Sequence, residues 1–183
     1  MKLSVTQKLL LSVLAFGLVV YIGGTIVRTA IAFEIYIPGT EMVLKTEYSD
    51  AIRLHTVKLY ATGALYTDIG FIAALVASIG ICIVFNKQLK LKGWLFIALL
   101  LIFIATPIEL YLTYLDLKLN HLIWGPVSSF NDPAIKEFFV RRFTKLTIPS
   151  ALAFLAISTS ILLAVWRPLD KSVPKSDTFE VNE

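Results

Sequence analysis

Four long apolar segments constrain this chain more than any other feature of its 183 residues. Each has at least the roughly 20 residues that a helix needs to cross about 30 Å of hydrocarbon, at about 1.5 Å per residue. A backbone in lipid must satisfy its own hydrogen bonds, and the short alternating strands of a membrane barrel are not seen here. The sequence therefore predicts an all-α, four-helix transmembrane bundle, forming one domain over residues 1–167. The spans are expected at about 9–33, 59–85, 94–117 and 144–166.

Composition supports this assignment and excludes several other classes of protein. Hydrophobic residues make up 57% of the chain and charged residues 16%, whereas soluble domains have about 45–50% and about 25%. The net charge of +4 would suggest a nucleic-acid partner in a soluble protein. Here most of the basic residues flank apolar segments, so membrane topology explains them and no nucleic-acid partner is expected. Cys82 is the single cysteine, which excludes an internal disulfide framework and disfavours a zinc cage.

The basic residues also predict an orientation. Lys2 and Lys8 precede the first span, three lysines lie in the connection 86–93, and Arg167 follows the fourth span. These places share one side of the membrane, and the positive-inside rule makes that side the cytoplasm. The basic cluster at 141–145 lies at the opposite end of the fourth span and disagrees with this assignment. We predict cytoplasmic N and C termini, in a multi-pass protein of a bacterial inner membrane.

Local signals predict structure outside the spans. Ser49 or Asp50 is a suitable N-cap, which would extend the second helix outward by two or three turns. Asp132 followed by Pro133 is typical of a helix start and predicts a short interfacial helix before the fourth span. The polar residues 168–183 are expected to form a disordered cytoplasmic tail.

Three ionisable residues inside the spans are the strongest candidates for a site. Arg28, Asp68 and Glu109 come from three different spans and fall in the same outer half. Each costs about 2.5–3.5 kcal/mol at the centre of a membrane helix, so such residues usually face a bundle interior or a cavity. Their signs would allow one cation to pair with two carboxylates.

These residues allow two interpretations. One is a structural ion-pair network that fixes the register of the helices. The other is a polar pocket that opens outward and binds a head group, an ion or a small amphiphile. In that second interpretation the pocket is lined by Arg28, Asp68 and Glu109, with Tyr66 and Tyr111 as hydroxyl donors and with Glu34, Asp116 and Arg142 at its rim.

The two histidines offer a weaker candidate site. His55 and His121 are expected at the outer surface near consecutive, antiparallel helices, where a facing pair could ligate haem or copper. Neither lies in a transmembrane polar stripe, and the sequence has no CxxCH motif for covalent haem. Ordinary interfacial histidines are the favoured interpretation, so no metal or other cofactor is expected.

The sequence favours a non-catalytic integral membrane protein. It lacks the Walker A, GxSxG and HExxH motifs of common enzyme classes. The favoured role is an accessory or interaction subunit, with the lipid bilayer and a protein partner or second copy as its contacts. The first alternative is a small ligand-binding or ion-conducting protein that uses the charged residues. The second is a membrane-embedded redox or lipid-modifying enzyme.

Overall fold

The computed structural model describes residues 3–40, 42–125 and 129–168, and the chain in these ranges is helical apart from short connections. Most of the predicted tail, residues 169–183, lies outside the described residues. Four long helices are present, as the sequence predicted, and each is long and apolar enough to cross a membrane. They are α1 (Val5–Ile35), α2 (Asp50–Val84), α4 (Gly93–Ile123) and α7 (Thr147–Trp166).

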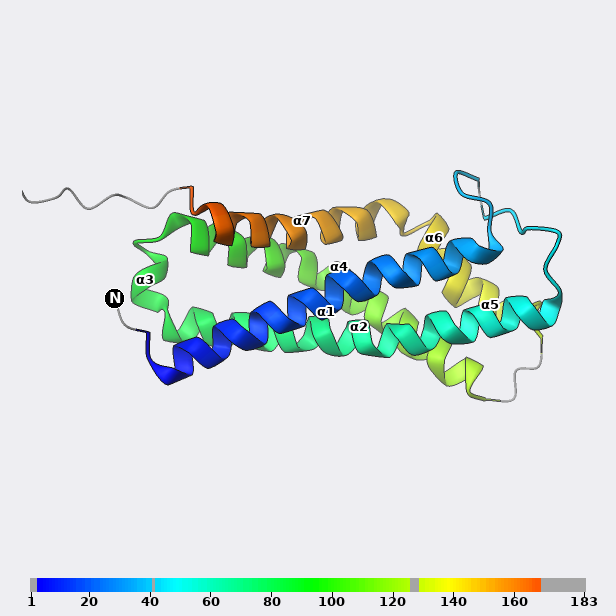
Figure 1. Cartoon of the computed structure of the whole chain (residues 1–183), viewed down its shortest axis with the longest axis horizontal. Helices are drawn as coiled ribbons and strands as arrows, with labels where there is room; N and C mark the ends of the chain where they lie inside the picture. Colours follow the sequence, from blue (N-terminus) through cyan, green and yellow to red (C-terminus); the bar gives the residue numbers. More distant parts are fainter. Residues whose placement is uncertain (1–2, 41, 126–128, 169–183) are drawn as a thin grey trace, which may run out of the picture.

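The four helices lie side by side in an elongated bundle, and consecutive helices run in opposite directions (Figure 1). The pairs with the most extensive contacts are α1 with α2 and α4 with α7, and α2 with α4 joins the two pairs. By contrast, α1 and α7 hardly touch. The bundle is therefore closed on three sides and opens between α1 and α7.

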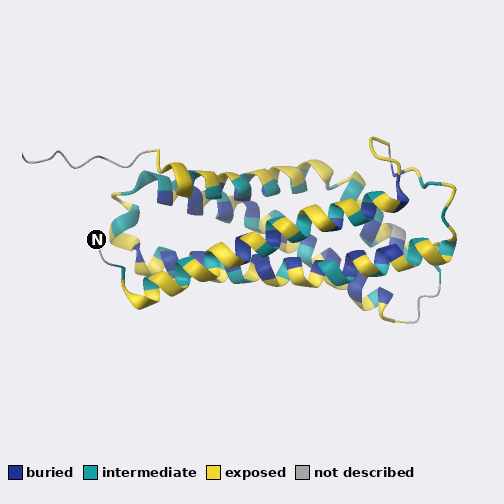
Figure 2. Ribbon diagram, viewed as in Figure 1, coloured by how far each residue is buried: buried dark blue, intermediate teal, exposed yellow. Residues whose placement is uncertain are grey.

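Two glycines allow α1 and α2 to pack closely. A Cβ atom on Gly17 would lie 2.7 Å from the carbonyl oxygen of Gly70 and 2.9 Å from the backbone nitrogen of Ala74. A Cβ atom on Gly70 would lie 3.0 Å from the carbonyl oxygen of Gly17. Small residues of this kind let membrane helices approach backbone to backbone. Outside this seam the long helices carry exposed residues along their length (Figure 2), and many of these have large apolar side chains.

Two helix starts lie where the local sequence signals predict them. The Ser49 side chain caps α2 by accepting a hydrogen bond from the Ile52 N–H at 3.4 Å, so α2 does extend beyond its predicted span. The Asp132 side chain accepts from the Ala134 N–H at 2.8 Å, just where the helical stretch before α7 begins. This stretch consists of α5 (Pro133–Ile135), the π-helical turn η1 (Lys136–Val140) and α6 (Arg141–Thr144).

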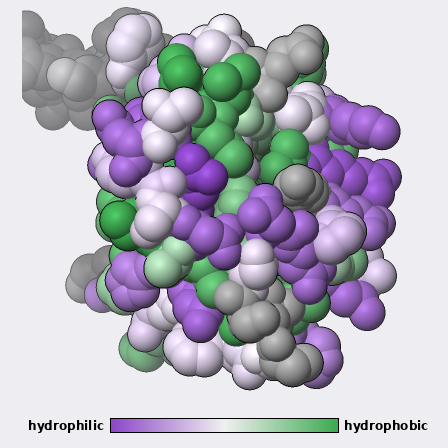
Figure 3. Space-filling view, turned by 90° about the vertical axis from the view of Figure 1, so that its right-hand side faces the viewer, coloured by the Kyte–Doolittle hydropathy of each residue, from purple (hydrophilic) through white to green (hydrophobic). Residues whose placement is uncertain are grey.

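We call the loop 42–49 and the residues 129–146 the cap. They cover the same end of the bundle (Figure 1), and that end face carries many hydrophilic residues (Figure 3). The Asp50 carboxylate, in the first turn of α2 directly after the loop 42–49, holds the second cap segment, because it accepts from the Ser129 hydroxyl at 3.1 Å and from the Phe130 N–H at 3.3 Å. The cap and the helix ends that it covers share an apolar core, whose largest buried side chains are Ile35, Tyr36, Tyr60, Leu119, Ile123, Phe130, Ile135 and Phe139.

Two local features differ from the sequence-based expectation. A short helix, α3 (Asn86–Leu89), lies in the connection that was expected to be a simple loop. Pro149 predicts a kink near the start of the fourth span. The helix is instead interrupted just before the proline, at Lys145 and Leu146. Pro149 lies in the first turn of α7, where its missing N–H costs no intrahelical hydrogen bond.

Candidate functional site: a charged triad and a pocket between α1 and α7

A buried triad of charged side chains lies beneath the cap. Asp116 of α4 accepts a hydrogen bond from Arg142 Nη1 at 2.6 Å and lies 2.7 Å from Arg28 Nη2 of α1. The Arg28 contact joins the two charges without good hydrogen-bond alignment. The Arg28 and Asp116 side chains are each about 3% exposed, and Arg142 is 11% exposed. One carboxylate therefore holds two guanidinium groups that come from different parts of the chain.

Neighbouring groups hold the triad in place. The Arg28 guanidinium lies over the Tyr60 ring, 4.5 Å from its centroid, so the aromatic face adds a cation–π contact. One turn beyond Asp116, the Asn120 side-chain amide donates to the Ala61 carbonyl of α2 at 2.7 Å. Phe139 and Phe143 pack edge-on against Tyr60. Together these contacts fix α1, α2, α4 and the cap relative to one another.

Arg142 remains a cation in this setting. Burial lowers the pKa of its guanidinium and is the largest single effect, but Asp116 and the other acidic groups around it together outweigh burial and hold the pKa above its ordinary value. Within the described residues, its one side-chain hydrogen bond goes to Asp116. The Arg142 side chain is only slightly exposed, and it lines a pocket.

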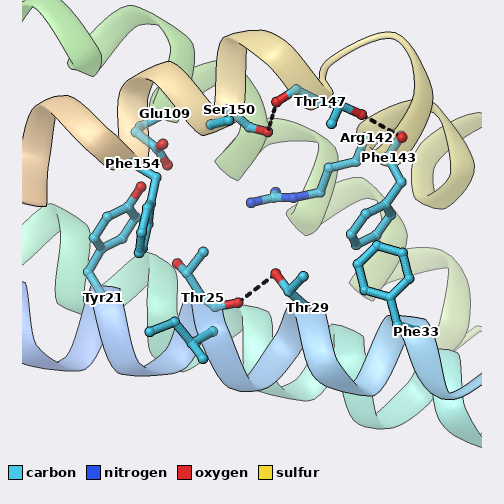
Figure 4. A pocket seen from close by; sticks show the side chains of 12 residues that line it. Tyr21, Thr25, Thr29, Phe33, Glu109, Arg142, Phe143, Thr147, Ser150 and Phe154 are labelled. Carbon is cyan, nitrogen blue, oxygen red and sulfur yellow. Dashed lines mark hydrogen bonds between the residues drawn. The ribbon is translucent and has the colours of Figure 1, made fainter. Parts of the chain in front are cut away.

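This pocket has a volume of about 380 Å³ and lies where α1 and α7 fail to meet. Such a volume is in the range of small-molecule sites. Figure 4 shows the Arg142 side chain extending into it, with Tyr21 and Glu109 together at the far end and the Tyr21 hydroxyl directed toward the carboxylate. Its wall combines aromatic rings with hydroxyl groups, from Tyr21, Thr25, Thr29, Phe33, Phe143, Thr147, Ser150 and Phe154.

One hydroxyl in the pocket wall is without a partner. In the described part of the chain, the Thr25 side-chain oxygen is buried and makes no hydrogen bond, although Thr25 lines the pocket. The neighbouring Thr29 and Ser150 hydroxyls donate to carbonyls of their own helices, at 2.8 and 3.0 Å. A buried unsatisfied hydroxyl is costly.

Asp68 and Glu109, the two carboxylates expected to pair with Arg28, form no salt bridge with it among the described residues. Arg28 pairs with Asp116 rather than with Asp68 or Glu109. Asp68 accepts from the Thr113 hydroxyl at 3.1 Å and does not line the pocket. Glu109 is buried and does line it. The proposed pairing of one cation with the two carboxylates is thus replaced by a triad centred on a residue that was expected at the rim.

The other candidates lie apart from the triad. Tyr66 and Tyr111 are 66% and 38% exposed and do not line the pocket. Glu34 is also exposed, and it accepts a hydrogen bond from the Tyr48 hydroxyl at 2.6 Å, which raises the pKa of that phenol. His55 and His121 are exposed at the surface. Across residues 3–40, 42–125 and 129–168, no group of three or more His, Cys, Asp or Glu is placed to hold a metal ion.

Sequence reasoning missed Tyr21 as a pocket residue and Asn120 as part of the triad's support. Asn120 could have been found, because it follows Glu109, Thr113 and Asp116 on the same helical stripe. Tyr21 could have been found in the same way, because Gly17, Tyr21, Gly24 and Arg28 recur at helical spacing on one face of α1. The pairing of Arg142 with Asp116 had no local signal, because it depends on how the cap folds back over α4.

Comparison with known proteins gives no further guide. No protein-family model, no curated protein and no solved structure matches this chain. What the arrangement can do must therefore be inferred from its own groups. These groups are the Arg142 guanidinium at one end of the pocket, the Glu109 carboxyl with the Tyr21 phenol at the other, and hydroxyls and aromatic rings between them.

Proposed function

We propose that this chain is a multi-pass membrane protein that binds an amphiphilic molecule in the pocket between α1 and α7. The observation that carries the proposal is a largely apolar pocket between two apolar helices, with the polar groups of Arg142 at one end and of Glu109 and Tyr21 at the other. A molecule with a polar head and an apolar tail matches both parts. It could enter sideways from the bilayer, because Ile26 and Ala151 at the pocket wall are exposed on the flank of the bundle.

The depth of the pocket supports this ligand class. Asp116 lies 22 residues after Trp94, which corresponds to about 33 Å of helix. The hydrocarbon core of a bilayer is about 30 Å thick. If Trp94 marks one interface, as tryptophan commonly does, the triad lies at the head-group level of the opposite leaflet. Glu109 lies seven residues closer to Trp94, about 10 Å deeper.

The sequence-based preference for an accessory or interaction subunit stays a prediction, as do ion conduction and membrane-embedded catalysis. The pocket favours ligand binding over the purely structural interpretation of the charged residues. The triad itself fits the structural interpretation, since its groups are packed against one another. The structural interpretation therefore applies to the triad and the ligand-binding interpretation to the neighbouring pocket. Arg142 belongs to both.

We expect that a bulky side chain at the pocket wall abolishes ligand retention. Ala151→Trp places an indole in the space between α1 and α7. The protein is reconstituted in nanodiscs of phosphatidylcholine, phosphatidylethanolamine and phosphatidylglycerol, released into mild detergent and examined by native mass spectrometry. The wild type should retain a bound lipid, and Ala151→Trp should reduce the bound fraction about tenfold or more, equivalent to about 1.4 kcal/mol of binding free energy.

Leu152→Trp is the matched control. Leu152 is the next residue on α7, is 60% exposed, and does not line the pocket. The Leu152→Trp variant should retain lipid as the wild type does. Equal retention by all three proteins would show that the lipid binds elsewhere on the apolar surface and would refute the proposal.

We further propose that the cap faces away from the cytoplasm, as the lysines at 86–93 suggest. The prediction is tested with a Cys82→Ser background and single cysteines introduced at Lys90 and at Lys45. In intact cells, a membrane-impermeant maleimide should label the cysteine at Lys45 and leave that at Lys90 unlabelled. Labelling only at Lys90 would reverse the orientation.

A further inference from the structure

We infer that the amphiphile is an anionic phospholipid whose phosphate binds the guanidinium of Arg142. This inference rests on the proposed function and adds the chemical class of the head group. It is carried by the charge of the triad, by the direction of the Arg142 side chain and by the level at which that side chain lies in the membrane.

The triad has an excess of positive charge. Arg28 and Arg142 share the single carboxylate of Asp116, and among the described residues no other carboxylate lies within 4.0 Å of either guanidinium. Arg28 is enclosed between Asp116 and the Tyr60 ring and does not line the pocket. The uncompensated charge is therefore presented through Arg142, which is the residue that reaches the pocket. A charge left partly unpaired near lipid favours binding of an anion.

The geometry of arginine suits a phosphate. A guanidinium presents five N–H donors in a planar fork and binds phosphate oxygens in pairs. Arg142 uses Nη1 for Asp116, which fixes the plane of the group. The guanidinium points into the pocket, whose wall also includes Thr29 and Thr147 (Figure 4). At the head-group level estimated above, the group within reach of these donors is the phosphate of a lipid.

Substitution of Glu109 should affect the binding of an anionic lipid differently from substitution of Arg142. Its carboxylate lines the same pocket about two helical turns deeper. It would repel an anionic ligand if it is charged, or donate a hydrogen bond to the lipid's ester region if it is protonated. Removal of its charge by Glu109→Gln should therefore leave the binding of an anionic lipid unchanged or increase it. Removal of the charge of Arg142 should weaken that binding.

The experiment compares diazirine-tagged lipids with the same acyl chains in phosphatidylcholine nanodiscs. The probes are phosphatidic acid, phosphatidylcholine and diacylglycerol, with a tagged fatty acid as the carboxylate arm. Cross-linked peptides are mapped by mass spectrometry, and labelling within 143–154 and 21–33 reports on the pocket. In the wild type, phosphatidic acid should label these peptides about tenfold more than phosphatidylcholine, as expected for about 1.4 kcal/mol of preference.

The chain offers a matched pair of arginines for the variants. Arg142→Gln should lose the preference for phosphatidic acid, whereas Arg141→Gln should keep it, because Arg141 is exposed and does not line the pocket. If Arg142→Gln fails to fold, Arg142→Lys replaces it. Arg142→Lys keeps the positive charge but lacks the planar donor fork of arginine, so it should reduce the preference for phosphatidic acid only partly.

The outcomes separate the two proposals. If the pocket peptides are labelled equally by all tagged lipids, the site binds amphiphiles but the anionic head group is wrong. Preferential labelling by the fatty acid would overturn the phosphate assignment, and an equal effect of Arg141→Gln and Arg142→Gln would point to general surface attraction instead. If no tagged lipid labels the pocket peptides, the proposed function itself fails.

Discussion

Asp116→Asn should destabilise this protein more than any other single charge removal. The substitution leaves the guanidinium groups of Arg28 and Arg142 buried together without the carboxylate that holds them. Loss of one partner from a buried ion pair costs about 3–5 kcal/mol, because the remaining charge stays desolvated. Here two like charges would remain, so we expect the upper part of that range. The measurement is the free energy of unfolding, or the thermal midpoint, in mild detergent.

Two further variants make this prediction specific. Glu137→Gln removes an exposed acid of the cap and should change stability by less than about 0.5 kcal/mol. The double variant Asp116→Asn with Arg28→Gln removes one of the two stranded cations and should recover part of the loss. A thermal midpoint unchanged by Asp116→Asn would mean that the triad does not stabilise the bundle.

The structure also changes the expectation for the other acids. If Arg28 were paired with Asp68 and Glu109, an Asp68→Asn, Glu109→Gln double variant would remove both of its counter-charges. Because Arg28 instead contacts Asp116, we expect this double variant to be much less destabilising than Asp116→Asn alone. The comparison of the two in the same detergent tests directly which carboxylate neutralises Arg28.

Gly17→Ala should separate α1 from α2 and is the second large effect. The added methyl would lie 2.7 Å from the Gly70 carbonyl oxygen and 2.9 Å from the Ala74 nitrogen, and a backbone cannot move aside as a flexible side chain does. Overpacking of a tight contact typically costs about 1–3 kcal/mol. Since α1 also forms one wall of the pocket, lipid retention should fall together with stability.

Gly23→Ala provides the control on the same helix. A Cβ atom at Gly23 would have no neighbour within 4 Å. Alanine is a better helix former than glycine by about 1 kcal/mol in soluble helices, so this variant should be neutral or slightly stabilising. If Gly17→Ala and Gly23→Ala behave alike in thermal unfolding, the close contact between α1 and α2 does not limit stability.

Much of the fold follows from local sequence. The four apolar segments, the Ser49 cap and the Asp132–Pro133 start all correspond to features of the structure. Each depends on a few neighbouring residues, or on the length of one apolar run. Local rules did not reveal the helical turn at Asn86–Leu89, because a short polar stretch has no amphipathic period to indicate it.

The candidate site was predicted only in part. Three spans were expected to contribute charge to one end of the bundle, and Arg28 and Glu109 do lie near that end. The sequence offers only the sign of each charge and its approximate depth for pairing residues on different helices. These two properties do not decide whether Asp68 or Asp116 is the partner of Arg28. Tyr66 and Tyr111 were chosen because they are near those acids in sequence, yet their rings lie on the outer surface of the bundle.

By itself, the sequence determined that this chain forms four apolar helices that can cross a membrane, and which residues would be costly to expose to lipid. Hydropathy and backbone hydrogen bonding act within one helix, so they can be evaluated from residues close in the chain. Only the tertiary structure decided that Asp116 joins Arg28 to Arg142, and that α7 packs on α4 and leaves a pocket beside α1. Those outcomes depend on the rotation of each helix and on the path of the cap, which are set by contacts between residues far apart in the sequence.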